Sequence, residues 1–177
     1  MKLSHLTENT NKLVLEALPY GITDLEPVMH RDVVKYHYSI LSAGYVDRYN
    51  NSEGDPEFNR AGALLHNLWW AQLSKPKVNN LPTGSSKELI DRVHGDFDTF
   101  RDKFIDESLK LQGSGWCYLA KDGSISTLKN QSWKSTVIMP IDLWEHASNP
   151  LTLRKDYMKT IWRIINWSVI NDRLNLG

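Results

Sequence analysis

The chain of 177 residues is 41% hydrophobic and 24% charged, which is typical of one globular domain or of two small ones that share a core. Because 21 basic residues balance 21 acidic ones, no overall field favours binding to nucleic acid or to an anionic membrane. The single cysteine, Cys117, excludes an internal disulfide framework, and no apolar run approaches the roughly 18 residues of a membrane helix. With its polar beginning, the chain is expected to be a soluble, cytoplasmic protein.

The first half of the chain predicts a pair of helices joined by a short loop. After a turn at residues 18–21 (LPYG), apolar residues recur at helical spacing from 32 to about 49. The polar residues 50–56 end this helix, and a second run of helical spacing extends from 58 to about 73. Two helices with so short a connection form an α-hairpin.

The second half combines helices with short strands. Residues 74–84 are rich in Ser, Pro, Gly and Asn and form a linker, and SSKE at 85–88 has the form of a capping box that begins a helix. A further amphipathic helix is expected from 97 to 111, ended by the glycines at 113–115. Three antiparallel strands are expected next, at residues 116–120, 125–128 and 135–139.

The chain is expected to close with two more helices. The last strand would run through Pro140 into a short helix bearing Asp142 and His146, and residues 157–173 have the spacing of an amphipathic helix. These elements predict an α+β fold, with an N-terminal α-hairpin and a C-terminal α/β domain that contains a small three-stranded antiparallel sheet. The expected domains are 1–80 and 81–177.

Asp142 and His146 form the strongest local chemical signal. They are four residues apart, so on a helix both side chains would lie on one face, one turn apart, where they could bind a single metal ion. An Asp and a His at this spacing also occur as an ordinary surface pair, and the spacing alone does not decide between the two interpretations.

Two of the other histidines strengthen the metal interpretation. His37 and His66 lie among large apolar residues, one in each helix of the predicted hairpin. Either one alone would be interpreted as a buried core histidine. In contrast, His5, His30 and His94 lie in polar segments or near helix ends, where solvated or capping roles are expected.

The combined set of possible ligands consists of three imidazoles and one carboxylate, supplied by both predicted domains. Three nitrogens and one oxygen without thiolate suit manganese, iron or zinc, and exclude sites that need sulfur. A coordination position left open for solvent would make the site catalytic. We therefore expect a metal site between the two domains.

These residues resemble those of a known family, the iron/manganese superoxide dismutases. The resemblance extends over nearly the whole chain from Leu18 and rests on separate blocks in the right order. The N-terminal blocks are LPY at 18–20, YHY at 36–38 with Tyr45 eight residues beyond His37, and FN at 58–59 followed, one residue early, by His66 and Trp70. The C-terminal blocks are GSGW at 113–116, DLWEHA at 142–147, and Trp162 with NW at 166–167.

The resemblance implies a superoxide dismutase with one manganese or iron ion per chain. One superoxide would reduce the trivalent ion and leave as dioxygen, and a second would reoxidise it and leave as hydrogen peroxide. Hydrogen bonds around the ion and its solvent ligand would tune the potential between these half-reactions. The implied metal ligands are His37, His66, Asp142 and His146.

The resemblance also implies two catalytic residues, Gln131 and Tyr45. Gln131 occupies the place where manganese-type members carry a glutamine that bonds the solvent ligand. Iron-type members usually supply that glutamine four residues before the second ligand, and this chain has Gly62 there, so manganese is favoured and iron is the alternative. Tyr45 would gate the substrate and pass protons. Without the resemblance, Gln131 would be a plain loop amide and Tyr45 a core side chain.

Aromatic and basic side chains complete the expected site. Trp70, Trp116 and Trp144 would wall the metal pocket, whereas packing explains most of the other tryptophans. Arg154 is the candidate cation that attracts the superoxide anion, and an exposed, solvated arginine is an equal alternative.

The chain departs from the family at the entrance to the site. Leu41 and Ser42 stand where members commonly have two histidines, and Asn149 stands where they have a tyrosine; in the family these side chains line the entrance and bond across a two-fold interface. Glu145, which in the family reaches the partner's metal-binding histidine, is kept, so a homodimer is expected. The departures leave one alternative, a non-catalytic interaction or structural protein that retains the fold and the metal site. Another metal-dependent oxidase or hydrolase is a weaker alternative.

Overall fold

The computed structural model describes residues 12–148 and 152–176, so His5 and Asn149 lie outside the described residues. The elements are, in chain order, α1 (Arg31–Tyr36), the π-helical turn η1 (His37–Ser42), α2 (Ala43–Asn50), α3 (Pro56–Ala71), α4 (Gly84–His94), α5 (Phe97–Lys110), β1 (Gly115–Ala120), β2 (Ile125–Lys129), β3 (Val137–Asp142), the 3-10 turn η2 (Glu145–Ala147), α6 (Arg154–Thr160), the 3-10 turn η3 (Ile161–Ile164) and α7 (Trp167–Asn175). This arrangement confirms the predicted α+β fold.

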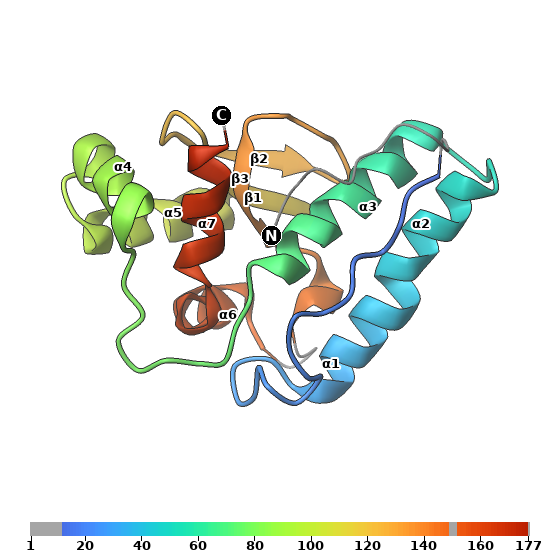
Figure 1. Ribbon diagram of the computed structural model, residues 1–177, viewed down its shortest axis with the longest axis horizontal. Helices are drawn as coiled ribbons and strands as arrows, with labels where there is room; N and C mark the ends of the chain where they lie inside the picture. The colour runs from blue at the N-terminus through green and yellow to red at the C-terminus, as the bar shows by residue number, and fades with distance from the viewer. Residues whose placement is uncertain (1–11, 149–151, 177) are drawn as a thin grey trace.

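The N-terminal hairpin forms as the sequence predicts, with one irregularity. α1, η1 and α2 follow one another without a break, and α3 lies antiparallel beside them (Figure 1). Asp55 caps α3 by accepting a hydrogen bond from the amide of Phe58. The irregularity is the π-helical turn, in which Ser42 Oγ donates to the carbonyl oxygen of His37, 2.9 Å away. Such turns often mark functional sites in helices.

The predicted three-stranded antiparallel sheet is present, in the order β2-β1-β3. α3 and α7 pack against β3, and α5 packs against β1 and β2, so the sheet lies between the hairpin and the pair α4 and α5 (Figure 1). Every residue of β1 and β3 is buried. Trp116 on β1 is paired in register with Asp142, the last residue of β3. The sheet therefore places a carboxylate in the interior.

An aromatic cluster anchors the C-terminal helices beside the sheet. Phe100 and Phe104 on α5 are fully buried and pack edge-on against Trp162, with ring centroids 5.8 and 5.2 Å apart. Such pairs add about 0.5–1.5 kcal/mol each beyond the burial of their area. The sequence interpretation of Trp162 as a packing residue is therefore confirmed.

Asp142 does not lie on a helix, contrary to the sequence prediction. The chain stays extended beyond β3, because the amide of Leu143 still donates to Gly115 on the neighbouring strand and Trp144 has a ψ of 149°. The chain then turns, and Asp142 Oδ1 accepts a hydrogen bond from the amide of Trp144 at 2.8 Å. A strand end and a short turn bring Asp142 and His146 together, in place of the predicted helical face.

The predicted capping box at 85–88 is also wrong. α4 begins at Gly84, and Thr83 before it makes no side-chain cap. Ser86 Oγ donates to the carbonyl of Thr83, and the amide of Ser86 donates to Asn171 Oδ1 on α7, 2.7 Å away. A residue distant in sequence thus satisfies a free amide in the first turn of α4.

The predicted closing helix at 157–173 is divided into three parts, α6, η3 and α7. The break falls at Ile165 and Asn166, where the chain pairs with the end of α3. The amide of Asn166 donates to the carbonyl of Gln72 at 2.7 Å, and Leu73 forms an antiparallel bridge with Ile165. These hydrogen bonds require extended backbone and so interrupt the helix.

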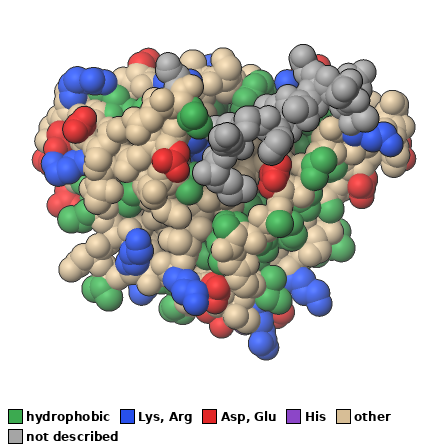
Figure 2. Space-filling model, in the orientation of Figure 1, with side chains coloured by type: hydrophobic (Ala, Val, Ile, Leu, Met, Phe, Trp, Pro, Cys, Tyr) green, Lys and Arg blue, Asp and Glu red, His purple; other side chains and the backbone are tan. Residues whose placement is uncertain are grey.

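None of the helices within residues 12–148 and 152–176 is long and apolar enough to span a membrane. On the face drawn in Figure 2, basic and acidic side chains are interspersed, in keeping with the equal numbers of the two kinds. This face offers no broad field of one sign.

Candidate metal centre

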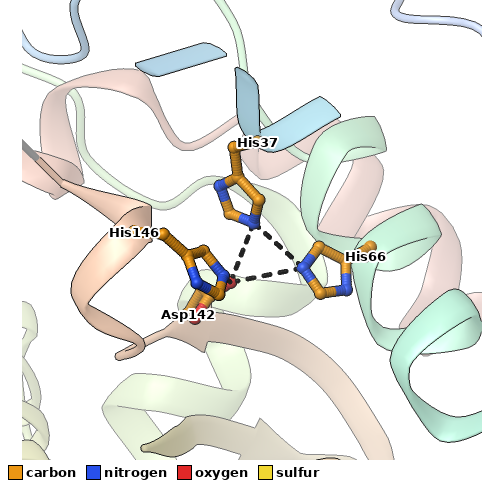
Figure 3. Close-up of side chains that lie close together, drawn as sticks. All are labelled: His37, His66, Asp142 and His146. Carbon is orange, nitrogen blue, oxygen red and sulfur yellow. Dashed lines mark hydrogen bonds and ion pairs between the residues drawn. The ribbon is translucent and has the colours of Figure 1, made fainter. Parts of the chain in front are cut away.

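Four side chains from separate elements converge at one point between the hairpin and the sheet (Figure 3). His37 comes from η1, His66 from α3, Asp142 from the end of β3 and His146 from η2. One nitrogen of each histidine and one oxygen of Asp142 all lie within 4.8 Å of one another. Asp142 Oδ2 is 3.1, 3.5 and 3.8 Å from the Nε2 atoms of His37, His66 and His146, respectively. The structure thus brings together all four residues that the sequence analysis selected.

Burial sets the protonation of the imidazoles. Desolvation lowers the pKa of His37 and His66 to about 3 and that of His146 to about 4, so all three are neutral at physiological pH. A neutral imidazole has the lone pair that a metal ion requires. Burial raises the pKa of the Asp142 carboxyl group, and a bound cation would favour its ionised form.

The tautomer of His66 follows from its hydrogen bond to the backbone. Nδ1 lies 2.6 Å from the carbonyl oxygen of Gly62. Because a carbonyl oxygen can only accept, Nδ1 carries the hydrogen, and the lone pair of the neutral ring is on Nε2. That atom faces His37 Nε2 at 2.9 Å. A second partner of this kind is what orients most metal-binding histidines.

Two buried atoms of the cluster show that it fits a cation. Asp142 Oδ2 and His146 Nε2 are buried without a hydrogen-bond partner among the described residues. An unsatisfied buried polar atom costs about 1–3 kcal/mol, and more when it is charged. One metal ion would satisfy both, and three nitrogens with one oxygen suit manganese, iron or zinc.

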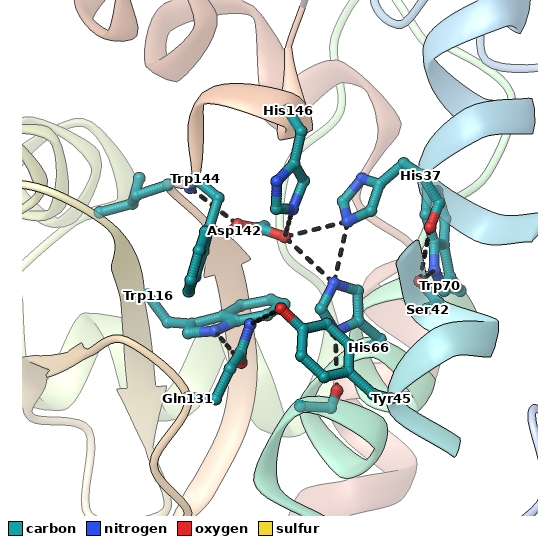
Figure 4. Close-up of polar contacts among 12 residues, drawn as sticks. His37, Ser42, Tyr45, His66, Trp70, Trp116, Gln131, Asp142, Trp144 and His146 are labelled. Atoms are coloured by element: carbon teal, nitrogen blue, oxygen red, sulfur yellow. Dashed lines mark hydrogen bonds and ion pairs between the residues drawn. The ribbon is translucent and has the colours of Figure 1, made fainter. Parts of the chain in front are cut away.

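A chain of hydrogen bonds lies next to the cluster (Figure 4). Trp116 Nε1 donates to Gln131 Oε1 at 2.9 Å, and Gln131 Nε2 donates to the hydroxyl of Tyr45 at 3.1 Å. The ring of Tyr45 stacks on that of His66, with centroids 5.2 Å apart, and burial raises the pKa of its phenol. The two residues predicted to be catalytic are therefore joined directly to each other beside the four possible ligands.

Comparison with known proteins decides which family has this site. The α-hairpin domain of the iron/manganese superoxide dismutases matches residues 12–60, and their C-terminal domain matches residues 82–173. The chain belongs to the iron/manganese superoxide dismutase family. The resemblance stated from the sequence is confirmed.

Three superoxide dismutases from other organisms are similar to this chain. The mitochondrial manganese superoxide dismutase of Onchocerca volvulus is 32% identical to this chain, over 93% of the chain and 89% of that protein. The iron enzyme of Bacteroides fragilis is 31% identical over 89% of the chain and 96% of its own length. The manganese/iron enzyme of Porphyromonas gingivalis is 32% identical over 93% of the chain and 99% of its own length.

Three tryptophans line the candidate metal centre of this superoxide dismutase family member. Trp70 packs edge-on against His37 with ring centroids 4.8 Å apart, and Trp116 packs edge-on against His66 at 5.0 Å. Trp144 stacks on His146 at 5.4 Å. These contacts agree with the predicted role of the tryptophans as walls of the pocket.

Ser42 has a contact that the sequence analysis missed. It stands where family members commonly have a histidine, and its hydroxyl accepts a hydrogen bond from Trp70 Nε1 at 2.9 Å while donating to the carbonyl of His37. Ser42 is fully buried. The first ligand-bearing helix is thereby tied to the second, and no local pattern could have indicated a partner 28 residues away.

Arg154 is half-buried and hydrogen-bonded to the backbone, so it is not the fully exposed arginine that the sequence analysis gave as an alternative. Its guanidinium donates to three backbone carbonyls, those of Leu111, Gly113 and Leu143, at 2.6, 2.7 and 2.9 Å. It joins the end of α5 to the segment that follows Asp142. This structural tie is enough to explain why the residue is an arginine, although its charge also acts to lower the pKa of the Asp142 carboxyl group, against the larger effect of burial.

Proposed function

We propose that the protein is a superoxide dismutase that uses one manganese or iron ion, held by His37, His66, Asp142 and His146. The observation that carries this proposal is the convergence of three neutral imidazoles and one carboxylate within 4.8 Å. The same donors also suit zinc, but the similar proteins are manganese, iron and manganese/iron superoxide dismutases, which favours a redox-active ion.

An ion of this kind, when held by these four residues, would supply one-electron chemistry, by which one superoxide is oxidised to dioxygen and another is reduced and leaves with two protons as hydrogen peroxide. The protein sets the charge of the site. Asp142 supplies one negative charge and the three imidazoles supply none, so a divalent or trivalent ion leaves the site positive. In buried surroundings this charge attracts an anion more strongly than it would in water.

Tyr45 and Gln131 are the proposed catalytic residues. The amide of Gln131 is held at both ends, by Trp116 Nε1 and by the Tyr45 hydroxyl. Because that hydroxyl accepts from Gln131, its own proton is free to be donated to the peroxide as it forms. Gln131 together with Gly62 also favours manganese over iron, since the chain has the manganese-type residue at both places.

A homodimer is the proposed assembly. Glu145 is exposed and adjacent to His146, whose side chain is 20% exposed and is the least buried of the four. A second copy could therefore bring its own carboxylate to this imidazole.

Residues 1–80 and 81–177 are the proposed domains, and the proposal is supported by the fact that each contributes two of the four possible metal ligands. The proposed location is the cytoplasm, because the single buried Cys117 suits a reducing compartment.

Metal analysis and a superoxide-removal assay on the same sample test the proposal. About one manganese or iron per chain, with activity, is the expected result. His66→Ala should lose both metal and activity, whereas Gln131→Ala should keep the metal and lose rate. His30→Asn is a matched control, because His30 caps α1 outside the cluster and asparagine is among the preferred N-cap residues.

Two outcomes would contradict the proposal. A full metal content in His66→Ala would refute its role as a ligand. Metal-loaded wild-type protein that removed no superoxide would favour the alternative suggested by Leu41 and Ser42, a non-catalytic binding protein that retains the fold and the ion.

A further inference from the structure

Arg173, on α7, is a buried cation that the proposed mechanism does not use. Only 7% of its surface is exposed, and among the described residues no carboxylate lies within ion-pair distance. Burial lowers the pKa of its guanidinium to about 9, so the group is still charged at neutral pH. Burying an unpaired charge is costly unless strong hydrogen bonds compensate. The groups that accept hydrogen bonds from Arg173 therefore indicate the role of this buried charge.

The acceptors belong to the two elements that carry His66 and Asp142. The guanidinium donates to the carbonyl of Leu68 at 2.7 Å and to Gln72 Oε1 at 2.8 Å, at the end of α3. It also donates to the carbonyl of Ile138 on β3 at 2.6 Å. Leu68 is two residues beyond His66, and Ile138 is four residues before Asp142.

Gln72 adds a second link between the same elements. Its side chain is fully buried, and Nε2 donates to the carbonyl of Pro140 on β3, two residues before Asp142. One oxygen of Gln72 accepts from Arg173 while its nitrogen binds β3, so the two side chains act as a single connection. Charge-assisted bonds such as those of Arg173 are roughly twice as strong as neutral ones.

We propose that Arg173, with Gln72, is a positioning residue for the metal site, a role that rests on the proposed function. The connection holds α3 and β3 at one separation, and so holds His66 and Asp142 at the distance that the ion needs. In well-formed metal sites the ligand-to-metal distances lie within about 0.2 Å of their usual values. A planar guanidinium reaches three fixed acceptors at once, which a lysine ammonium on a flexible stem does not reproduce.

Arg173→Lys tests the proposal, because it keeps the charge and loses the fork of donors. The matched control is Asn80→Ala, which removes a side chain that donates to the carbonyls of Trp162 and Ile165, on neither α3 nor β3. Each protein is loaded with cobalt(II) as a spectroscopic probe. The absorption spectrum and the rate of metal loss to a chelator are measured well below the unfolding temperature, and the unfolding of metal-free protein is measured separately.

Both variants should be less stable, but only Arg173→Lys should shift the cobalt bands and lose metal at least about tenfold faster, a factor that corresponds to 1.4 kcal/mol. A wild-type spectrum and rate of metal loss in Arg173→Lys would reduce the residue to a structural role and overturn the proposal. If Arg173→Lys does not fold, Gln72→Met provides the same test, since it removes both bonds of Gln72 without altering a charge. Wild-type protein that bound no metal would instead overturn the proposed function.

Discussion

Replacing Gly62 with alanine tests whether the phenol of Tyr45 must be held where the structure has it. A Cβ atom at residue 62 would lie 2.6 Å from Cδ1 and 2.7 Å from Cγ of Tyr45, whereas non-bonded carbon atoms normally approach to about 3.5 Å. The ring is rigid and is stacked on His66, so we expect it to move by about 1 Å. The hydrogen bond from Gln131 to Tyr45, now 3.1 Å long, would then be lost.

The expected result is a slower enzyme that still binds its metal. A misplacement of about 1 Å can cost about a hundredfold in rate. Overpacking costs about 1–3 kcal/mol of stability, and the better helix propensity of alanine offsets about 1 kcal/mol of it. Superoxide decay after pulse radiolysis, on protein of measured metal content, separates the two effects. Gly21→Ala is the control, because its Cβ would lie at an ordinary contact distance of 3.6 Å from Asp24.

A double variant shows whether the loss acts through the phenol. Tyr45→Phe lacks the hydroxyl and keeps the ring, so adding Gly62→Ala to it should lower the rate little further. A wild-type rate in Gly62→Ala at full metal content would refute the reasoning, and so would a loss that adds fully to that of Tyr45→Phe.

Three further predictions concern other side-chain contacts. Ser42→Ala should lower the free energy of unfolding of metal-free protein by about 1–3 kcal/mol in urea, more than Ser108→Ala, because Trp70 Nε1 loses its acceptor. Burial raises the pKa of the Cys117 thiol from 9.0 to about 12, so the folded protein should not react with a thiol reagent. Because the thiol ionises at a lower pH in the unfolded chain than in the folded one, the free energy of unfolding should fall between pH 9 and 12, by at most about 4 kcal/mol. Denaturation curves measured over this pH range should show no such loss for Cys117→Ala. Arg154→Met should be less stable in the same denaturation assay yet leave the ionic-strength dependence of superoxide removal unchanged, an outcome that a steering cation would not give.

Local periodicity predicted the elements that depend on local packing. The hairpin, α5 and the strands β1 and β2 begin and end within about two residues of their predicted bounds, because each buries a stripe or face that the sequence displays. The errors occur where a distant residue supplies a hydrogen bond. Asn171 satisfies the amide of Ser86 at the start of α4, and Gln72 pairs with Asn166 where the closing helix was expected to continue.

In the candidate site too, the sequence identified the residues but not the contacts between distant parts of the chain. Residue type selected His37, His66, Asp142 and His146, but the four-residue spacing of the last two fits a turn after a strand as well as a helix, and periodicity does not distinguish them. One hydrogen-bond partner of Arg173, Gln72, lies 101 residues away, and no motif or spacing connects such residues.

The four possible ligands, and likewise the pair Tyr45 and Gln131, come together only when the two halves of the chain are packed against each other. Tyr45 and Gln131, which bond each other, are 86 residues apart, and the four possible ligands come from both the hairpin and the region of the sheet. Without an ion, the folded state holds a buried carboxylate oxygen and an imidazole nitrogen unsatisfied. An ion that binds the folded chain alone adds about 2.7 kcal/mol of stability at a free concentration one hundred times its Kd. We therefore expect metal binding to be coupled to the packing of α3 against β3, because Arg173 donates hydrogen bonds to both of these elements, which carry His66 and Asp142.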